Sequence, residues 1–187
     1  RLSPIGEGVQ VMVYAPEEDS LFMQTCAFFE ALNYTIVDAK VHTARNGFTL
    51  NSFLILDKHH RVVAYRDFLS YIEHELALLL NSHEAPKSKA RGRVSRHLKH
   101  FPIDAEVMLR LGENGKFYTL NLIAGDRPGL LFSIAEVLNR HNINLHTAKI
   151  STLGERAEDT FMIQGDELSQ PKARRQLEID LLKVLNI

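Results

Sequence analysis

Ala148-Lys149-Ile150-Ser151-Thr152 repeats an earlier run of this chain, Ala39-Lys40-Val41-His42-Thr43, with Ile in place of Val and Ser in place of His. Working outward from these runs, Ala15–Thr43 aligns with Ala124–Thr152 without a gap. The matched positions include Leu21 with Leu130 and Asn33 with Asn142. Such self-similarity indicates a duplicated structural unit, and it decides the fold because each copy must form the same elements.

Each copy shows the same order of elements. In the first, hydrophobic periodicity predicts a strand over 9–14, a helix from about Asp19 to Leu32, strands over 35–44 and 48–56, and a closing helix around 68–79. In the second, it predicts a strand over 117–123, a helix from Pro128 to His141, two further strands, and a closing helix around 177–185. We expect Pro128 at the first helical position, where its missing N–H has no cost. The βαββα order is the split βαβ, ferredoxin-like pattern without its last strand.

A strand that precedes each copy could fill the missing position. Residues 105–111 alternate apolar side chains with others, and Gly112-Glu113-Asn114-Gly115 links them to the next strand by a hairpin signal. The first copy has a similar turn at Gly6-Glu7-Gly8, so we expect its preceding strand to lie mostly upstream of Arg1. The chain also begins with Arg1 instead of Met, which suggests a piece of a longer protein.

The predicted fold class is therefore α/β (α+β), with two ferredoxin-like domains, each an antiparallel sheet with two helices on one face. We place the first domain at residues 1–82 and the second at 104–187. Residues 83–103 form a basic linker, with Lys87, Lys89, Arg91, Arg93, Arg96 and Lys99. We expect no nucleic acid partner, because no aromatic stacking platform accompanies these cations and the chain's net charge is −1.

The second predicted strand of each copy changes phase in its hydrophobic alternation. Tyr34 and Ile36 are out of phase with Ala39 and Val41, and the second copy repeats this slip. Either a β-bulge or a strand buried on both faces would produce such a pattern.

Composition limits the protein class. The chain has 187 residues, 45% of them hydrophobic, and a single cysteine, which rules out a framework of disulfides within the chain. Cys26 lies in an apolar run, so we expect it to be a small buried hydrophobe. No apolar stretch reaches the roughly 20 residues that a membrane span needs. We therefore expect a cytoplasmic protein without a membrane partner.

The passage Gly125-Asp126-Arg127-Pro128-Gly129 carries the strongest indication of a site. It leads from a strand into a helix, where unpaired backbone N–H groups favour a carboxylate or a phosphate. Gly125 and Gly129 let a ligand approach the backbone closely. Asp126 could accept from a ligand ammonium group, with Asn144 or His146 reaching the ligand from a neighbouring strand. These groups would bind a free α-amino acid by both charged ends. The alternative is that Asp126 and Pro128 only start a helix while Arg127 is solvated.

The run Asp-Arg-Pro-Gly-Leu-Leu at 126–131, followed by Asn142-Ile143-Asn144, resembles the ACT domain, a family of small-molecule sensing modules. Residues 146–156 with Asp159-Thr160-Phe161, the earlier stretch 37–43, and 94–101 between the copies more narrowly resemble the tandem ACT repeats at the C-terminus of bifunctional PII uridylyltransferase/uridylyl-removing enzymes. The resemblance implies ligand-binding roles for Asp126, Arg127, Pro128, Gly129, Leu130, Leu131, Asn144 and His146, and in the first copy for Asp19, Ser20 and Leu21. The first copy departs from the motif, with Glu17-Glu18-Asp19-Ser20 in the matching stretch.

The resemblance further implies glutamine as the ligand, ACT–ACT pairing within or between chains, and the PII protein as a partner of the parent enzyme. That enzyme would transfer UMP to PII and hydrolyse it off again. Magnesium is expected for the parent, and no cofactor is expected for this chain. We see neither the carboxylates of a nucleotidyl-transfer centre nor a His-Asp hydrolytic centre, so we expect no catalysis here. His59-His60 is predicted to be a solvated turn; the alternative is a metal site. Two other functions stay open: an ACT pair of another amino-acid-regulated enzyme, and a purely structural dimerisation module.

Overall fold

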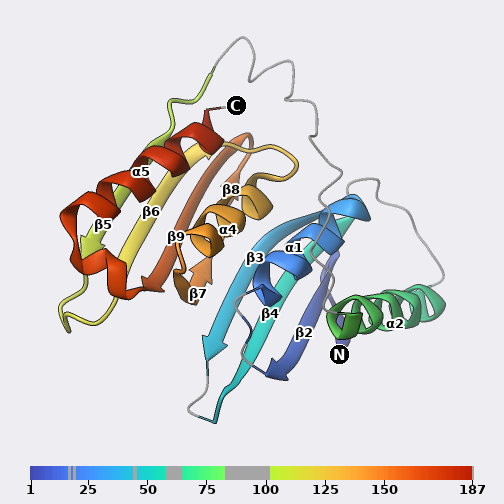
Figure 1. Cartoon of the computed structure of the whole chain (residues 1–187). Coiled ribbons are helices and arrows are strands. Elements are labelled where there is room, and N and C mark those ends of the chain that lie inside the picture. Colours follow the sequence, from blue (N-terminus) through green and yellow to red (C-terminus); the bar gives the residue numbers. More distant parts are fainter. Residues whose placement is uncertain (17, 19, 44–45, 58–64, 83–101, 187) are drawn as a thin grey trace.

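The computed structural model describes residues 1–16, 18, 20–43, 46–57, 65–82 and 102–186 (Figure 1). The first unit contains β1 (Leu2–Ile5), β2 (Gly8–Pro16), α1 (Leu21–Ala31), β3 (Tyr34–Thr43), β4 (Phe48–Asp57) and α2 (Tyr65–Ser82). The second contains β5 (Glu106–Leu111), β6 (Tyr118–Gly125), α4 (Leu130–Arg140), β7 (Asn144–Lys149), β8 (Thr152–Leu153), β9 (Arg156–Gln164), a 3₁₀ turn η1 (Asp166–Ser169) and α5 (Pro171–Leu185).

The two units have the same sheet topology. The strand orders are β1-β2-β4-β3 and β5-β6-β9-β7, with β8 paired to β9, and every pairing is antiparallel. The ferredoxin-like fold predicted from the repeat is confirmed. The preceding strand is confirmed as β5, which pairs with β6 in register from Glu106 opposite Ile123. In the first unit the expectation that this strand lies mostly upstream was wrong, because Leu2–Ile5 already form β1 against β2.

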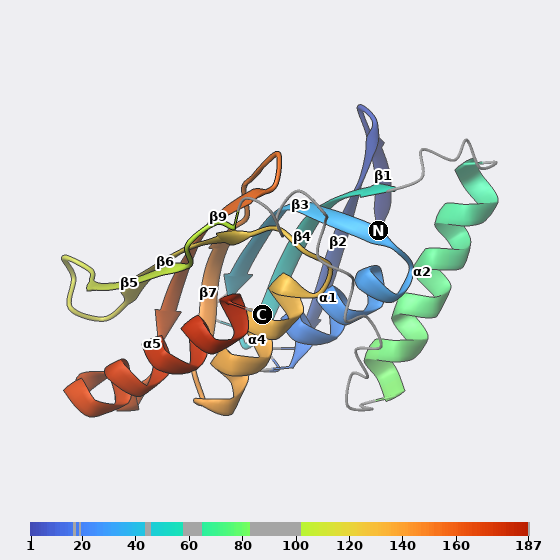
Figure 2. The same cartoon turned by 90° about the horizontal axis from the view of Figure 1, so that it is seen from above.

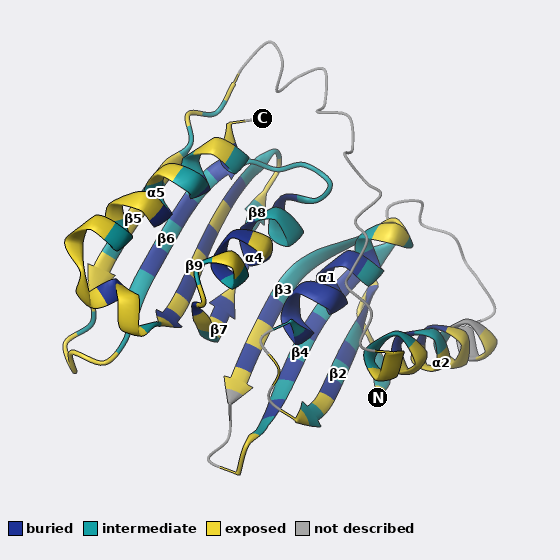
Figure 3. Cartoon of the chain, viewed as in Figure 1, coloured by how far each residue is buried: buried dark blue, intermediate teal, exposed yellow. Residues whose placement is uncertain are grey.

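The helices cover one face of the sheets, as predicted (Figures 1 and 2). Inward-facing strand residues such as Phe53 and Phe161 are almost fully buried, and α4 contributes Ile134 and Leu138 to this core. Along β4 and β9 the buried residues alternate with half-buried or exposed ones (Figure 3), as expected for strands with one covered face. Cys26 is buried in α1, as expected for a small hydrophobe.

The helices α1 and α4 both begin later in the chain than the sequence predicts. The predicted start at Pro128 was wrong: α4 begins at Leu130, because Gly129 at the N-cap has a left-handed backbone (φ +84°) that ends the preceding turn. Similarly, α1 begins at Leu21 with Ser20 at its N-cap, and Asp19 lies outside the described residues. The loop before each helix is therefore longer than predicted, which leaves Asp126, Arg127 and Pro128 in a turn and not in a helix.

The predicted phase change is a β-bulge in both units. The register of β3 against β4 shifts between Ile36 and Asp38, and that of β7 against β9 shifts between Leu145 and Thr147. These positions coincide in the repeat alignment. The alternative of a strand buried on both faces does not hold, since β7 has exposed residues along its length.

The two units pack side by side through their edge strands. β3 contacts β7 and α1 contacts α4, so the sheets lie next to each other with α1, α2, α4 and α5 on the same side (Figure 2). This arrangement is a pairing of the two repeats within one chain. The predicted linker 83–103 lies mostly outside the described residues, as do His59 and His60, so the domain boundaries stay predictions. None of the helices in the described ranges combines the length and apolar character that crossing a membrane requires.

Asn33 and Asn142, which are matched in the repeat, end the equivalent helices α1 and α4. Both have positive φ, 62° and 51°. After α4, the Asn142 amide donates to the carbonyl of Asn139 at 3.0 Å, and the Ile143 amide donates to that of Leu138 at 3.0 Å. This pair of bonds is a Schellman motif, which satisfies the last carbonyls of a helix and requires a left-handed residue.

We predict that Asn142→Ala lowers the free energy of unfolding by about 1 kcal/mol relative to Asn142→Gly, because alanine tolerates a left-handed backbone less well than glycine does. Urea unfolding of the two variants, followed by circular dichroism, would measure the difference. Equal stabilities would contradict the assignment of this residue as a conformational cap.

Candidate ligand site between the two units

Two cavities lie along the seam between the units, one toward each end of β3. The larger cavity has a volume of about 160 Å³ and the smaller about 50 Å³. The larger is lined by Cys26, Glu30, Tyr34, Thr35, Ile36, Asp126, Arg127, Pro128, Gly129, Leu130, Leu131, Phe132, Ile150, Thr152, Ala157 and Asp159. The smaller is lined by Glu18, Leu21, Phe22, Met23, Val41, Thr49, Asn51, Ala135, Leu138, Asn139, Ile143, Asn144 and Leu145. A cavity of roughly 150 Å³ can hold a small organic molecule, so the larger one is the candidate site.

The two cavities are equivalent under the repeat. The larger combines the loop before α4 in the second unit with the end of α1 and the start of β3 in the first unit. The smaller combines the segment before α1 in the first unit with the end of α4 and the start of β7 in the second. β3 and β7 therefore run in opposite directions across the seam. Each unit supplies one loop and one wall, and neither cavity forms within a single unit.

The loop Asp126–Gly129 is fixed by backbone hydrogen bonds. The Asp126 amide donates to the carbonyl of Glu155 at 2.7 Å, and the Leu130 amide donates to that of Arg127 at 3.2 Å. The Ser133 hydroxyl donates to the Gly129 carbonyl at 2.7 Å. Leu130, Leu131 and Phe132, the first residues of α4, line the larger cavity, and the N-terminal end of a helix favours an anionic group such as a ligand carboxylate.

Arg127 is not the solvated residue of the alternative interpretation. Its guanidinium donates to the carbonyl of Val184, near the end of α5, and its Nε is buried. Burial lowers the pKa of Arg127, while the nearby carboxylate of Glu30 acts in the opposite direction. Arg127 therefore ties the loop to the last turn of α5, where carbonyl groups attract a cation, and its charge faces the first unit.

Asp159 is a buried carboxyl group of the larger cavity. Its residue is only 4% exposed on β9. The pKa of Asp159 is raised to about 7, mainly by burial and also by the nearby Asp126, although the Ser151 amide, which donates to Oδ1 at 3.2 Å, acts in the opposite direction. A buried carboxyl that titrates near neutral pH in a cavity is typical of a functional site.

The predicted site residues separate into two groups. Asp126, Arg127, Pro128, Gly129, Leu130 and Leu131 all line the larger cavity. Asn144 and Leu21 line the smaller one. His146 lines neither; its ring contacts Phe117 and its Nε2 lies 3.0 Å from Oε1 of Gln164. Ser20 accepts a hydrogen bond from the Gln24 side chain at 3.2 Å.

Sequence reasoning missed Glu30, Tyr34 and Asp159, which complete the larger cavity. Glu30 and Tyr34 come from the first unit, and no local pattern indicates that they face the second unit. The repeat alignment could have indicated two of these residues, because Glu30 is matched with Asn139 and Asp159 is matched with Asn51. Both pairs place a carboxylate in one copy against an amide in the other.

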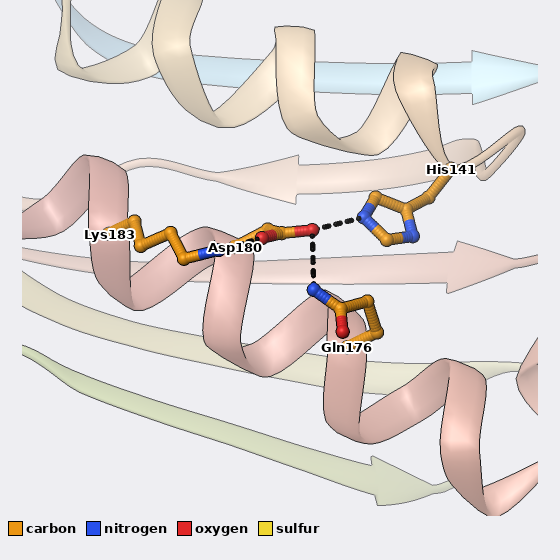
Figure 4. Close-up of polar contacts among 4 residues, drawn as sticks. All are labelled: His141, Gln176, Asp180 and Lys183. Atoms are coloured by element: carbon orange, nitrogen blue, oxygen red, sulfur yellow. Dashed lines mark hydrogen bonds and ion pairs between the residues drawn. The ribbon is translucent and has the colours of Figure 1, made fainter.

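A second polar cluster lies away from the seam cavities and joins α4 to α5 (Figure 4). Asp180 Oδ2 lies 3.2 Å from His141 Nε2 and accepts from the Gln176 side chain at 3.1 Å. Its Oδ1 accepts from Lys183 at 2.8 Å. Hydrogen bonds from Lys183, Gln176 and His141 hold the pKa of Asp180 well below its usual range. This cluster connects the two helices of the second unit.

The larger cavity can bind a small zwitterion. Asp126 offers an acceptor for an ammonium group, and the mouth of α4 offers donors for a carboxylate. No group of three His, Cys, Asp or Glu side chains that could hold a metal ion occurs within the described ranges.

Comparison with known proteins gives matches over both units. Residues 118–181 match the ACT domain. The chain is 49% identical to the bifunctional uridylyltransferase/uridylyl-removing enzyme of Thiobacillus denitrificans, over 99% of this chain and 22% of that protein. It is 46% identical to the enzyme of the same description from Ralstonia nicotianae, over 100% of this chain and 22% of that protein. The chain thus spans about a fifth of the length of these relatives.

We predict that Asp159→Asn removes a pH dependence of stability. The folded protein holds the Asp159 proton up to about pH 7, whereas the unfolded chain releases it near pH 4. The stability that this proton contributes is therefore complete below about pH 4 and is lost as the pH rises toward 7, with a slope of at most about 1.4 kcal/mol per pH unit.

Urea unfolding of both proteins at several values between pH 4 and 8 would test this. The Asn variant should gain stability relative to the parent protein across the range, with no further change above about pH 7. If the unfolding free energies of the two proteins differ by the same amount at every pH, Asp159 is ionised in the folded protein and the prediction is contradicted.

Proposed function

We propose, from the premise that residues 118–181 form an ACT domain, that this chain is the regulatory region of a bifunctional uridylyltransferase/uridylyl-removing enzyme and binds glutamine in the larger cavity. The identity over the whole chain to enzymes of that description supports the parent enzyme. The observation that carries the ligand assignment is the lining of the larger cavity, which offers an acceptor and helix-mouth donors from one short loop.

The loop suits the two charged ends of an α-amino acid. Asp126 would accept from the ligand's ammonium group, and the first-turn amides of α4 would bind its carboxylate. Gly129 leaves room for the ligand to approach the backbone. The side chain of the ligand would then extend toward the first unit, where Glu30, Tyr34 and Thr35 form the wall.

Ligand binding between the units would favour the paired arrangement over any arrangement that separates the units. A ligand shifts an equilibrium only by its difference in affinity for the two states, and a ligand held by both units has such a difference. We propose that glutamine signals through this pairing to the catalytic part of the parent enzyme, which acts on PII in the cytoplasm. Magnesium would bind in that catalytic part, because the residues described here provide no ligand set for it.

We predict that the chain binds glutamine and that Asp126→Asn weakens binding about tenfold to a hundredfold, because the acceptor of the ligand's ammonium group loses its negative charge. Calorimetric titration of the chain with glutamine measures both affinities. His146→Ala is the matched control, since His146 lies outside the cavity, and its affinity should equal that of the parent protein.

A titration with other amino acids separates the proposal from its rivals. Tight binding of a different amino acid, with no heat from glutamine, would assign the chain to another amino-acid-regulated enzyme. No binding of any amino acid to the paired chain would contradict the sensor function and favour a structural dimerisation role.

A further inference from the structure

The two seam cavities share their geometry but differ in charge. Two positions that carry carboxylates in the larger cavity, Glu30 and Asp159, carry the amides Asn139 and Asn51 in the smaller one. The smaller cavity forms at the same place in the fold with amides at these positions. The fold itself therefore does not need carboxylates there, and their presence in the larger cavity calls for a chemical reason.

Glu30 lies in the last turn of α1, in the first unit, so it belongs to the wall that faces the loop of the second unit. Both of its carboxylate oxygens are buried. The cation that interacts with it electrostatically, Arg127, also donates to the Val184 carbonyl. With Asp126 and Asp159, the lining holds three carboxyl groups and a single guanidinium, so its acidic groups outnumber its cations.

We propose that Glu30 is a specificity-determining residue, which admits amino acids whose side chain ends in an N–H donor and rejects those whose side chain ends in a carboxylate. This inference rests on the proposed function, because it assumes that an amino acid occupies the larger cavity. It adds that the first unit, which lacks the loop motif, selects the ligand side chain.

Glutamine and glutamate test this selection because they have nearly the same size and shape. A carboxamide offers two N–H donors to a carboxylate acceptor, whereas an ionised carboxylate offers none. Two like charges in a partly buried cavity repel strongly, because the surroundings screen them less than water does. A carboxylate side chain would therefore be excluded by charge and not by volume.

Calorimetric titration of the chain with glutamine and with glutamate provides the experiment. We expect the parent protein to bind glutamate about a hundredfold more weakly than glutamine, or weaker still. Glu30→Gln should reduce this ratio at least about tenfold, mainly by improving glutamate binding. Glu18→Gln is the matched control: it removes the same charge from the lining of the smaller cavity and should leave the ratio unchanged.

Each further outcome has a defined meaning. An unchanged ratio in a folded Glu30→Gln variant that still binds glutamine would overturn the inference while leaving the proposed function in place. An equal reduction in Glu18→Gln would also overturn it, because net charge alone would then explain the effect. If Glu30→Gln does not fold, Glu30→Asn, which introduces the amide found at the equivalent Asn139, is measured in its place and should reduce the ratio in the same direction. Failure of the parent protein to bind glutamine would instead remove the proposed function.

Discussion

The packing of β3 against β7 is the constraint on which the rest of the molecule depends. Each is the edge strand of its own sheet, and an exposed edge presents unpaired backbone groups to any other chain. By lying next to each other, the two edges shield one another, and α1 and α4 meet on the helical side of the same seam. Both cavities exist only because of this packing, since each takes its loop from one unit and its wall from the other.

The two ends of the seam are equivalent under the repeat, but different residues line the cavity at each end. The left-handed Gly129 has Ser20 at its matched position, where the backbone has a negative φ (−86°) before α1. Arg127 has Glu18 as its counterpart, so an anion stands in the first copy where the second copy has a cation. The larger cavity combines a cation fixed by Val184 with buried carboxyl groups, whereas the smaller one has side-chain amides at two of those positions. One half of the repeat therefore supplies the loop of the larger cavity, and the other supplies its wall.

The sequence predicted the elements within each unit better than the contacts between units. Repeat matching and periodicity predicted the strand order, the hairpin before β6 and the bulge in β3, because these depend on residues close in the chain. The start of α4 was misplaced because Pro128 is equally compatible with the turn that Gly129 ends. The six predicted residues at 126–131 all line the larger cavity, but Glu30 and Asp159, which also line it, were missed. Glu30 and Asp159 line the cavity only when the two units pack together, and hydrophobic periodicity within one unit does not indicate that packing. Arg127 could be interpreted as solvated because its hydrogen-bond partner, Val184, is distant in sequence.

Because both partners of the seam belong to one polypeptide, their association is an intramolecular event. Linking two binding surfaces replaces the protein concentration with a fixed effective concentration, which short connections raise to the millimolar range. Two separate copies would come apart on dilution, and their occupancy would then vary with the amount of protein in the cell. A tethered pair is assembled to the same extent in one molecule as in many, so occupancy of the proposed site would follow the abundance of its ligand and not that of the protein itself.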